Sequence, residues 1–242
     1  MKHILPLWAL ILTLCIGSCN QYDAPTVTGS ITGYVSPIDE SAANLPRNGV
    51  KVTIEEAGKS TISDANGYWI VNDVPAGIYT ISFSKDSFST NKIIAYQFVG
   101  NGTAYTATTQ LPKVPPYITT IDSVSYDTSG GKSVLISGTQ SRPQTQNRTV
   151  LLFLSKNSTV SANPKEYSAV VLSFVSALST SFAEAIPVSQ LQALGFSSGN
   201  TVYVTSYATS KQYYRYIDLA TGRNFYSGVM QSPTNTRSFV VP

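Results

Sequence analysis

Acidic side chains are the first candidates for chemistry in this chain, because two carboxylates that face each other across a cleft can hydrolyse a glycosidic bond. The adjacent acidic pairs are Asp39-Glu40 and Glu55-Glu56. Neighbouring residues on a strand point to opposite faces of a sheet, so Glu55 and Glu56 are not expected to face one substrate. Carboxylates from distant parts of the sequence can still converge, which keeps a hydrolase as an open alternative.

A charged residue, Lys2, and a short apolar stretch up to Leu14 open the chain. This pattern is typical of a signal peptide, and the stretch is too short to span a membrane as a helix. The next residues, Ile16-Gly17-Ser18-Cys19, resemble the lipobox of bacterial lipoproteins. The resemblance implies a signal peptide at 1–18, a lipid-modified Cys19, and a polar tether at 19–26 that joins the protein to a membrane.

The residue after the predicted anchor bears on where the protein resides. Asn20 stands where inner-membrane lipoproteins of enteric bacteria carry Asp, so we expect a lipid-anchored protein of the bacterial outer membrane. The sequence does not determine whether it faces the periplasm or the cell surface. Lipoproteins of this family carry two or more acyl chains, and a single chain would anchor the protein only marginally.

Histidine and cysteine, the residues of most zinc sites and catalytic triads, leave with the signal peptide. His3 and Cys15 lie within residues 1–18, and Cys19 is consumed by the lipid. The mature chain therefore has no residues for zinc sites built from His or Cys, for Ser-His-Asp triads or for Cys-His pairs. We predict a non-enzymatic protein with no catalytic residue, no metal and no cofactor.

Charged residues are scarce and dispersed along the chain. They make up 12% of the residues, with 16 basic and 13 acidic side chains, which is about half of the usual share of roughly 25%. No two Lys or Arg residues are adjacent, so the clustered basic stripe that nucleic-acid binding requires is not visible. We expect no nucleic-acid partner.

Tyrosine is the remaining chemical signal, with 15 residues that concentrate near the C-terminus. If the valines beside them face the core, alternation places Tyr203 and Tyr207 on the outer face of one strand. Tyr214 and Tyr216 share a face of the next predicted strand. These four tyrosines are the predicted binding residues, because such a surface can stack on sugar rings or anchor a protein partner. The alternative is that they pack against the first domain.

Period-two alternation of apolar residues, as in Val50-Val52-Ile54, predicts strands along most of the chain. The segment Lys113–Pro116 predicts a linker between two domains, because proline lacks the N–H that a central strand needs. A single short helix is predicted at 189–194, with Ser189 as its N-cap. Strands at this spacing, without alternating helices, predict an all-β protein of two β-sandwich domains at 27–113 and 117–242.

Both predicted domains resemble known families. The segments 29–35, 48–52, 63–68 and 74–81 make the first domain similar to the carboxypeptidase regulatory-like domain, a transthyretin-like β-sandwich. The run from Asn200 to Thr209, with Leu194 and Gly199, makes the second similar to immunoglobulin-like, fibronectin type III-like domains of envelope proteins. The first resemblance implies an accessory module, since zinc peptidases with this module carry their chemistry in a separate domain. Its wider fold group includes starch-binding modules, so carbohydrate binding is an analogy at the level of the fold.

These observations favour a lipid-anchored, non-enzymatic envelope protein that acts as a protein-interaction or structural accessory module. The alternative is a carbohydrate-binding surface lipoprotein that captures polysaccharides. An exposed tyrosine platform would favour the glycan, whereas buried tyrosines would favour the protein partner. Convergent carboxylates in a deep pocket would favour the hydrolase.

Overall fold

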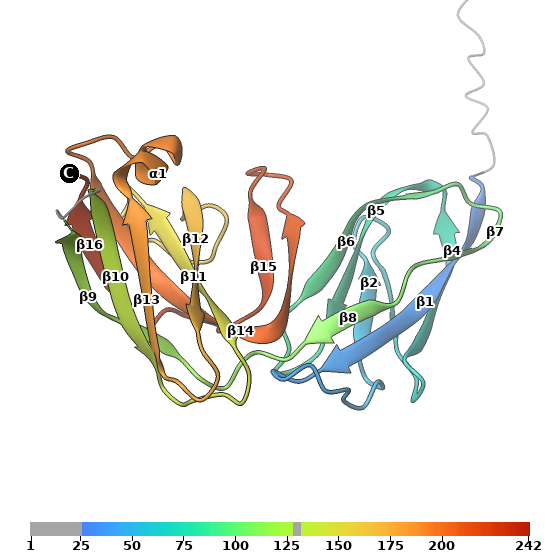
Figure 1. The fold of residues 1–242 in the computed structure, drawn as a ribbon. Coiled ribbons are helices and arrows are strands. Elements are labelled where there is room, and N and C mark those ends of the chain that lie inside the picture. Colours follow the sequence, from blue (N-terminus) through green and yellow to red (C-terminus); the bar gives the residue numbers. More distant parts are fainter. Residues whose placement is uncertain (1–25, 128–131) are drawn as a thin grey trace, which may run out of the picture.

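The computed structural model describes residues 26–127 and 132–242 (Figure 1). The predicted signal peptide, the lipidation site Cys19 and nearly all of the predicted tether lie outside the described residues. Almost all regular structure is β-strand, and the strands form two sandwiches that lie side by side in Figure 1. The expected all-β fold class is therefore confirmed, while the exact domain boundaries stay a prediction.

The N-terminal sandwich consists of two sheets that enclose one hydrophobic cluster. One sheet has the order β4-β1-β7, with β8 also paired to β1, and the other has the order β3-β2-β5-β6. We call them the β1 sheet and the β5 sheet. Their strands are β1 (Thr28–Ile38), β2 (Lys51–Ile54), β3 (Lys59–Ile62), β4 (Tyr68–Pro75), β5 (Gly77–Ser84), β6 (Asn91–Phe98), β7 (Gly102–Tyr105) and β8 (Thr109–Pro112).

The C-terminal sandwich also has two sheets, with a short helix at one end. The β10 sheet has the order β13-β10-β9, and the β14 sheet has the order β12-β11-β14-β15, with β16 paired to β14. The elements are β9 (Thr119–Asp127), β10 (Ser133–Gln140), β11 (Arg148–Ser155), β12 (Ala169–Val175), β13 (Ser181–Pro187), α1 (Val188–Ala193), β14 (Thr201–Ile217), β15 (Asn224–Val229) and β16 (Thr236–Val240).

Alternation along the strands explains the two cores. In the N-terminal sandwich, Val52 and Ile54 on β2 pack beside Trp69 on β4, and all three are buried. In the C-terminal sandwich, Val150 and Leu152 on β11 face the cluster between the two sheets. Burial of this apolar surface, at roughly 25 cal/mol per Å², is the main force that holds each sandwich together.

The predicted helix is present, but its N-terminus is not capped as expected. It begins at Val188 after Pro187 and has no side-chain capping hydrogen bond, so the prediction that Ser189 is its N-cap is wrong. Gly195 follows the helix with a φ of +90°, a conformation that favours glycine and ends the helix. None of the described residues forms a helix long and apolar enough to cross a membrane.

Candidate functional site

The four predicted tyrosines do not form one outward face. Alternation placed Tyr203 and Tyr207 on the correct side of β14, opposite Val202 and Val204, which lie in the core between the sheets. Tyr207 is nevertheless only 2% exposed, so the prediction that it faces solvent is wrong. Tyr203 is partly buried against the same second cluster.

A second hydrophobic cluster covers the outer face of the β14 sheet and explains this burial. The segment between β11 and β12 contributes Val160 and Tyr167, and β15 contributes Tyr226 and Val229. The ring centroids of Phe153 lie 5.0, 5.1 and 5.5 Å from those of Tyr167, Tyr207 and Tyr226, with the rings edge to face. Such pairs stabilise a core beyond their buried area. We call Phe153, Tyr167, Tyr207 and Tyr226 the aromatic cluster.

Tyr214 and Tyr216 lie on the same strand as Tyr207, not on the next strand as predicted. The register of β14 shifts between Thr209 and Tyr214, after which the strand leaves β11 and pairs with β15. The shift turns the end of β14 toward the N-terminal sandwich (Figure 1). The Tyr214 hydroxyl donates a hydrogen bond to the side-chain oxygen of Gln110 on β8. The sequence also left open the alternative that these tyrosines pack against the first domain. For Tyr214, this alternative is correct.

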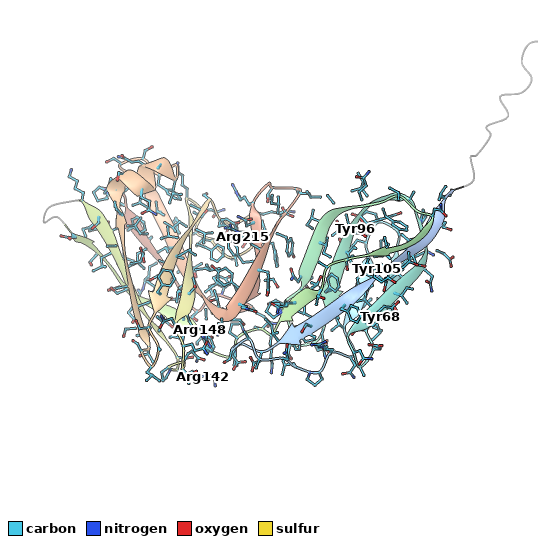
Figure 2. All side chains as sticks on the ribbon, turned by 45° about the vertical axis from the view of Figure 1, so that its right-hand side comes forward. Tyr68, Tyr96, Tyr105, Arg142, Arg148 and Arg215 are labelled. Carbon is cyan, nitrogen blue, oxygen red and sulfur yellow. The ribbon has the colours of Figure 1, made fainter. Side chains whose placement is uncertain are left out.

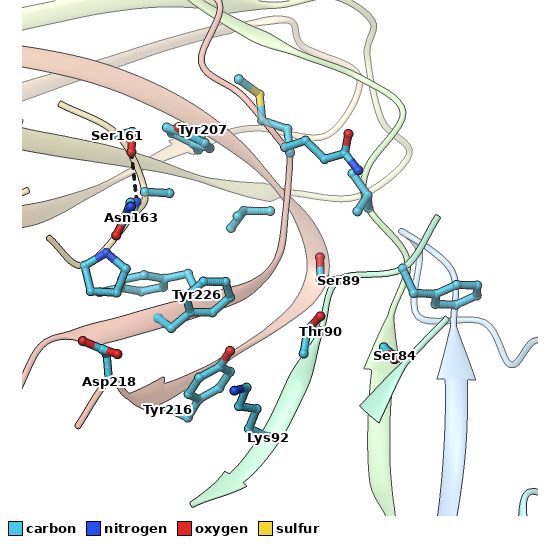
Figure 3. Close-up of a pocket in the computed structure, with 18 of the residues that line it drawn as sticks. Ser84, Ser89, Thr90, Lys92, Ser161, Asn163, Tyr207, Tyr216, Asp218 and Tyr226 are labelled. Atoms are coloured by element: carbon cyan, nitrogen blue, oxygen red, sulfur yellow. Dashed lines mark hydrogen bonds between the residues drawn. The ribbon is translucent and has the colours of Figure 1, made fainter. Parts of the chain in front are cut away.

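An open cleft of about 860 Å³ lies between the two sandwiches and is lined by both (Figure 3). We call it the intersandwich cleft. Its volume falls in the range of roughly 300–1,000 Å³ that is typical of small-molecule sites. Two of the predicted tyrosines, Tyr207 and Tyr216, line it, whereas Tyr203 and Tyr214 do not.

The N-terminal wall of the cleft is rich in hydroxyl groups. Ser82 and Ser84 lie on the outer face of β5, because the alternate residues Ile81 and Phe83 point into the core. Lys92 on β6 is the cross-strand partner of Ser82. The Lys92 ammonium lies 2.7 Å from the Glu55 carboxylate, so these two charges pair within the wall. Further lining residues on this side are Phe88, Ser89, Thr90 and Val114.

The C-terminal wall is more aromatic. Tyr216 on β14 stacks on its cross-strand partner Phe225 on β15, with ring centroids 5.0 Å apart and ring planes 19° from parallel. Tyr226 of the aromatic cluster lies beside them, and Asp218 lies at the end of the hairpin. Figure 3 shows Tyr216 of this wall next to Lys92 of the N-terminal wall. The segment 161–165 completes this wall.

The Tyr216 hydroxyl stays protonated. Burial raises its pKa well above the usual value, and the negative charges of Glu55 and Asp218 raise it further. A neutral phenol both donates and accepts a hydrogen bond. Tyr216 therefore offers the cleft a stacking face and a hydroxyl that can bond a neutral polar ligand.

The two carboxylates of the cleft are already engaged within the protein. Glu55 pairs with Lys92. Asp218 accepts hydrogen bonds from the Thr221 hydroxyl at 2.6 Å and from the Thr221 backbone N–H at 3.0 Å. Among residues 26–127 and 132–242, no group of three or more His, Cys, Asp or Glu side chains is placed to hold a metal ion. The arrangement is suited to holding a polar ligand by stacking and hydrogen bonds.

A polar junction lies beside β14 where the two sandwiches meet. Arg148 is 2% exposed, and its Nε donates to the Tyr117 hydroxyl at 3.1 Å, while that hydroxyl donates to the Thr209 carbonyl at 2.6 Å. The Lys211 N–H donates to the Glu40 carbonyl of the N-terminal sandwich at 2.8 Å. The Lys211 bond ties β14 to the loop after β1, whereas the bonds of Arg148 and Tyr117 hold the neighbouring part of the C-terminal sandwich together.

Sequence reasoning missed most of the cleft. Glu55 was considered only as a partner of Glu56, and Lys92, Phe88 and Phe225 carried no signal because isolated residues of these types are common on strands. The alternation of Ser82 and Ser84 with buried Ile81 and Phe83 was the available clue, since it predicts a hydroxyl-bearing outer face.

No protein-family model and no curated protein matches this chain. Among solved structures, it is similar to a type II Cohesin-X-Dockerin complex from Acetivibrio cellulolyticus, with 26% identity and a TM-score of 0.30 over 34% of this chain and 56% of that chain. This chain therefore spans just over half of that structure's length.

Two further solved structures are matched over most of their length. One is a "putative carbohydrate binding protein" from Bacteroides uniformis, with 14% identity and a TM-score of 0.30 over 88% of this chain and 99% of that chain. The other is a DUF3823 family protein from Parabacteroides merdae, with 12% identity and a TM-score of 0.29 over 84% of this chain and 96% of that chain. At these TM-scores the likenesses carry no functional argument.

Proposed function

We propose that the protein is a lipid-anchored, non-enzymatic envelope protein that binds a neutral glycan in the intersandwich cleft. The burial of Tyr207 removes the tyrosine platform that the sequence predicted as support for a glycan. The cleft supplies a different support: an aromatic wall faces a hydroxyl-rich wall across an open space. This facing of two chemically different walls is the observation that carries the proposal.

The two walls match the two kinds of surface on a sugar ring. A pyranose has apolar C–H faces, which stack on aromatic rings, and hydroxyl groups around its edge, which need hydrogen-bond partners. The stacked pair Tyr216 and Phe225 offers the first, and Ser82 and Ser84 offer the second. The Lys92–Glu55 pair leaves little net charge on the wall, which favours a neutral ligand over an anionic one.

The contacts of the two cleft carboxylates, Glu55 and Asp218, favour binding of a glycan over its hydrolysis. A glycosidase needs one carboxylic acid to give a proton and a second carboxylate to attack or to activate water. Glu55 is held by Lys92, and Asp218 accepts two hydrogen bonds that stabilise its own turn. Neither group is free to exchange a proton with a ligand without breaking these contacts.

The cleft proposal is tested by glycan-array binding followed by calorimetry with the full chain. Tyr216→Ala should weaken binding on the order of tenfold, since loss of a stacked ring costs about 1 kcal/mol or more. Ser60→Ala, a hydroxyl loss at an exposed strand position that does not line the cleft, is the control and should bind normally. Unchanged affinity in Tyr216→Ala would contradict the cleft proposal, and time-dependent release of reducing ends would contradict the non-enzymatic role.

A protein-interaction or structural role is the second candidate, and one surface favours it. Leu172 and Phe174 on β12 lie on the outer face of the β14 sheet and are 44% and 63% exposed. Exposed apolar side chains grouped in this way are typical of protein contact sites. Cross-linking in cells with wild type and Phe174→Ala tests this role, because a specific protein partner should be lost from the variant.

The anchor forms the remaining part of the proposal, and it rests on the sequence around Cys19. Cys19→Ala should move the protein from the membrane fraction to soluble or unprocessed forms, because the lipid supplies the membrane affinity. Fractionation after a carbonate wash measures the shift. Retention of the variant with outer membranes would show that another feature anchors the protein.

A further inference from the structure

Three tyrosines on the N-terminal sandwich form an exposed surface that neither the cleft nor the core uses. Tyr34 on β1 is 45% exposed, Tyr105 on β7 is 71% exposed, and Tyr68 on β4 is partly exposed. Tyr34 and Tyr68 are cross-strand partners with ring centroids 5.5 Å apart. Tyr105 is the cross-strand partner of Thr32, two residues before Tyr34 on the same face of β1. Figure 2 labels Tyr68 and Tyr105 on this sandwich.

The strand register shows that the regular outward positions of this face are uncharged, while two charges lie at its edge: exposed Asp73 in the bulge of β4 opposite Ser30, and Lys59, whose ammonium donates to the Asn72 carbonyl at 3.3 Å. Residues of the β1 sheet that alternate with the buried Ile31, Trp69 and Val71 point outward. The outward positions on the three adjacent strands are Ser30, Thr32, Tyr34, Tyr68, Ile70, Asn72, Thr103 and Tyr105. Thr32 is nevertheless fully buried beneath its neighbours, and its hydroxyl donates to the Trp69 carbonyl. Three of the eight are tyrosines, four carry an aliphatic hydroxyl or amide group, one is aliphatic, and none is charged at neutral pH. We call these eight residues the β1 platform.

The platform faces away from the intersandwich cleft. The cleft is lined by residues of the β5 sheet, such as Ser82, whereas the platform belongs to the β1 sheet. The two sheets pack against each other through a shared cluster that includes Trp69 and Ile81. Outer faces of two packed sheets point in opposite directions, so one site can be changed without touching the other.

The fold itself does not require Tyr105 or Tyr34 at these positions. A ring that is 71% exposed contributes little buried area, and strand positions of this kind accept smaller polar residues equally well. Ser30 donates a hydrogen bond to the Asn72 side chain within the platform at 2.9 Å, which orients the amide at its edge. The platform extends over about 13 Å along the strands and about 10 Å across them, from the spacings of a β-sheet.

We propose that the β1 platform is a second glycan-binding surface, which takes a segment of a neutral polysaccharide. The exposed rings provide stacking faces for sugar rings, and the exposed Thr103 hydroxyl and Asn72 amide provide hydrogen bonds to their edges. None of the eight platform residues is charged at neutral pH, which fits an uncharged polymer, and the exposed Asp73 carboxylate at the edge disfavours an acidic one. The surface does not depend on the cleft, and the two sites together would hold one polysaccharide at two points or two chains at once.

The test uses the full chain as the cell produces it, purified in mild detergent. It measures binding to insoluble cellulose, xylan, starch and mannan and to their soluble oligosaccharides. The variants are Tyr105→Ala, the double variant Tyr34→Ala/Tyr105→Ala, and the cleft variant Tyr216→Ala. Leu178→Ala is the control, because its apolar side chain is 78% exposed on the other sandwich and lines neither the cleft nor the platform. The melting temperature of each variant is measured in parallel.

We expect the double platform variant to lose at least tenfold in affinity for the bound polysaccharide while its melting temperature and the control's binding stay unchanged. Unchanged binding in the double variant would overturn the platform, even if Tyr216→Ala binds less and so supports the cleft. Failure of wild type to bind any of these glycans would overturn it as well. Self-association or protein capture that is lost in Tyr105→Ala, without glycan binding, would assign the surface to a protein partner and overturn the glycan proposal.

Discussion

The tyrosines of β14 and β15 and the tyrosines of the β1 platform occupy equivalent positions on their sandwiches, yet they have opposite environments. Both groups lie on the outer face of a sheet. Tyr207 and Tyr226 are 2% and 8% exposed, whereas Tyr34 and Tyr105 are 45% and 71% exposed. The difference is that β15 and the segment before β12 fold over the first group, whereas none of the described residues covers Tyr34 and Tyr105 of the β1 sheet in this way.

The contrast shows that two properties of a strand residue have different origins: the face of the sheet on which its side chain lies, and whether that face is buried. Alternation determines which side chains share a face of a sheet. Whether that face is exposed to solvent depends on which other segments pack against it. In the C-terminal sandwich, the residues that cover the face come from two distant segments. A tyrosine-rich face is therefore a core in one sandwich and an exposed surface in the other.

The largest effect expected from this comparison is on stability. Tyr207→Ala should lower the free energy of unfolding by about 3–5 kcal/mol, because it leaves a cavity within the aromatic cluster. Tyr105→Ala should change it by less than about 0.5 kcal/mol, because its ring is mostly exposed. Urea unfolding of the full chain measures both values. Similar losses in the two variants would show that the two faces do not differ as described.

A smaller effect is expected from removing a single hydroxyl group. Tyr117→Phe removes the donor to the Thr209 carbonyl and the acceptor of the Arg148 guanidinium, and should cost about 1–3 kcal/mol because both partners are buried. The matched change Tyr34→Phe removes a hydroxyl from the platform and should be nearly neutral. Equal stabilities of Tyr117→Phe and wild type in urea would contradict the role of the polar junction.

The smallest expected effect is the dependence of stability on pH that comes from Tyr167 in the aromatic cluster, and it is seen only at alkaline pH. Burial raises the pKa of Tyr167 to about 12, and the nearby Tyr226 adds to this increase. A folded-state pKa above the unfolded value of roughly 10 gives stability that is present below pH 10 and is lost as pH rises toward 12. Tyr167→Phe should show a shallower loss of stability over this range. Urea unfolding at a series of pH values measures the free energy of unfolding of the variant and of wild type. If the two free energies fall in parallel with pH, the prediction is wrong.

The sequence alone was sufficient for the class of fold and for the faces of individual strands. Alternating apolar residues such as Val52 and Ile54 predicted buried positions correctly, because a strand's periodicity is local. The helix at 188–193 was also predicted nearly in place. Its cap was not, since a cap depends on backbone geometry at Pro187 that residue types do not determine.

By itself, then, the sequence determined that this is an all-β protein and that Tyr203 and Tyr207 lie opposite the core valines of β14. Only the tertiary structure decided that β14 continues to Ile217, that β15 buries Tyr207, and that Ser82 and Tyr216 meet across a cleft. Side-chain direction is set by neighbouring backbone units, whereas burial and the pairing of cleft walls depend on contacts between segments far apart in the chain. Tyr216 and its neighbours in the N-terminal wall are brought together only when both sandwiches have formed.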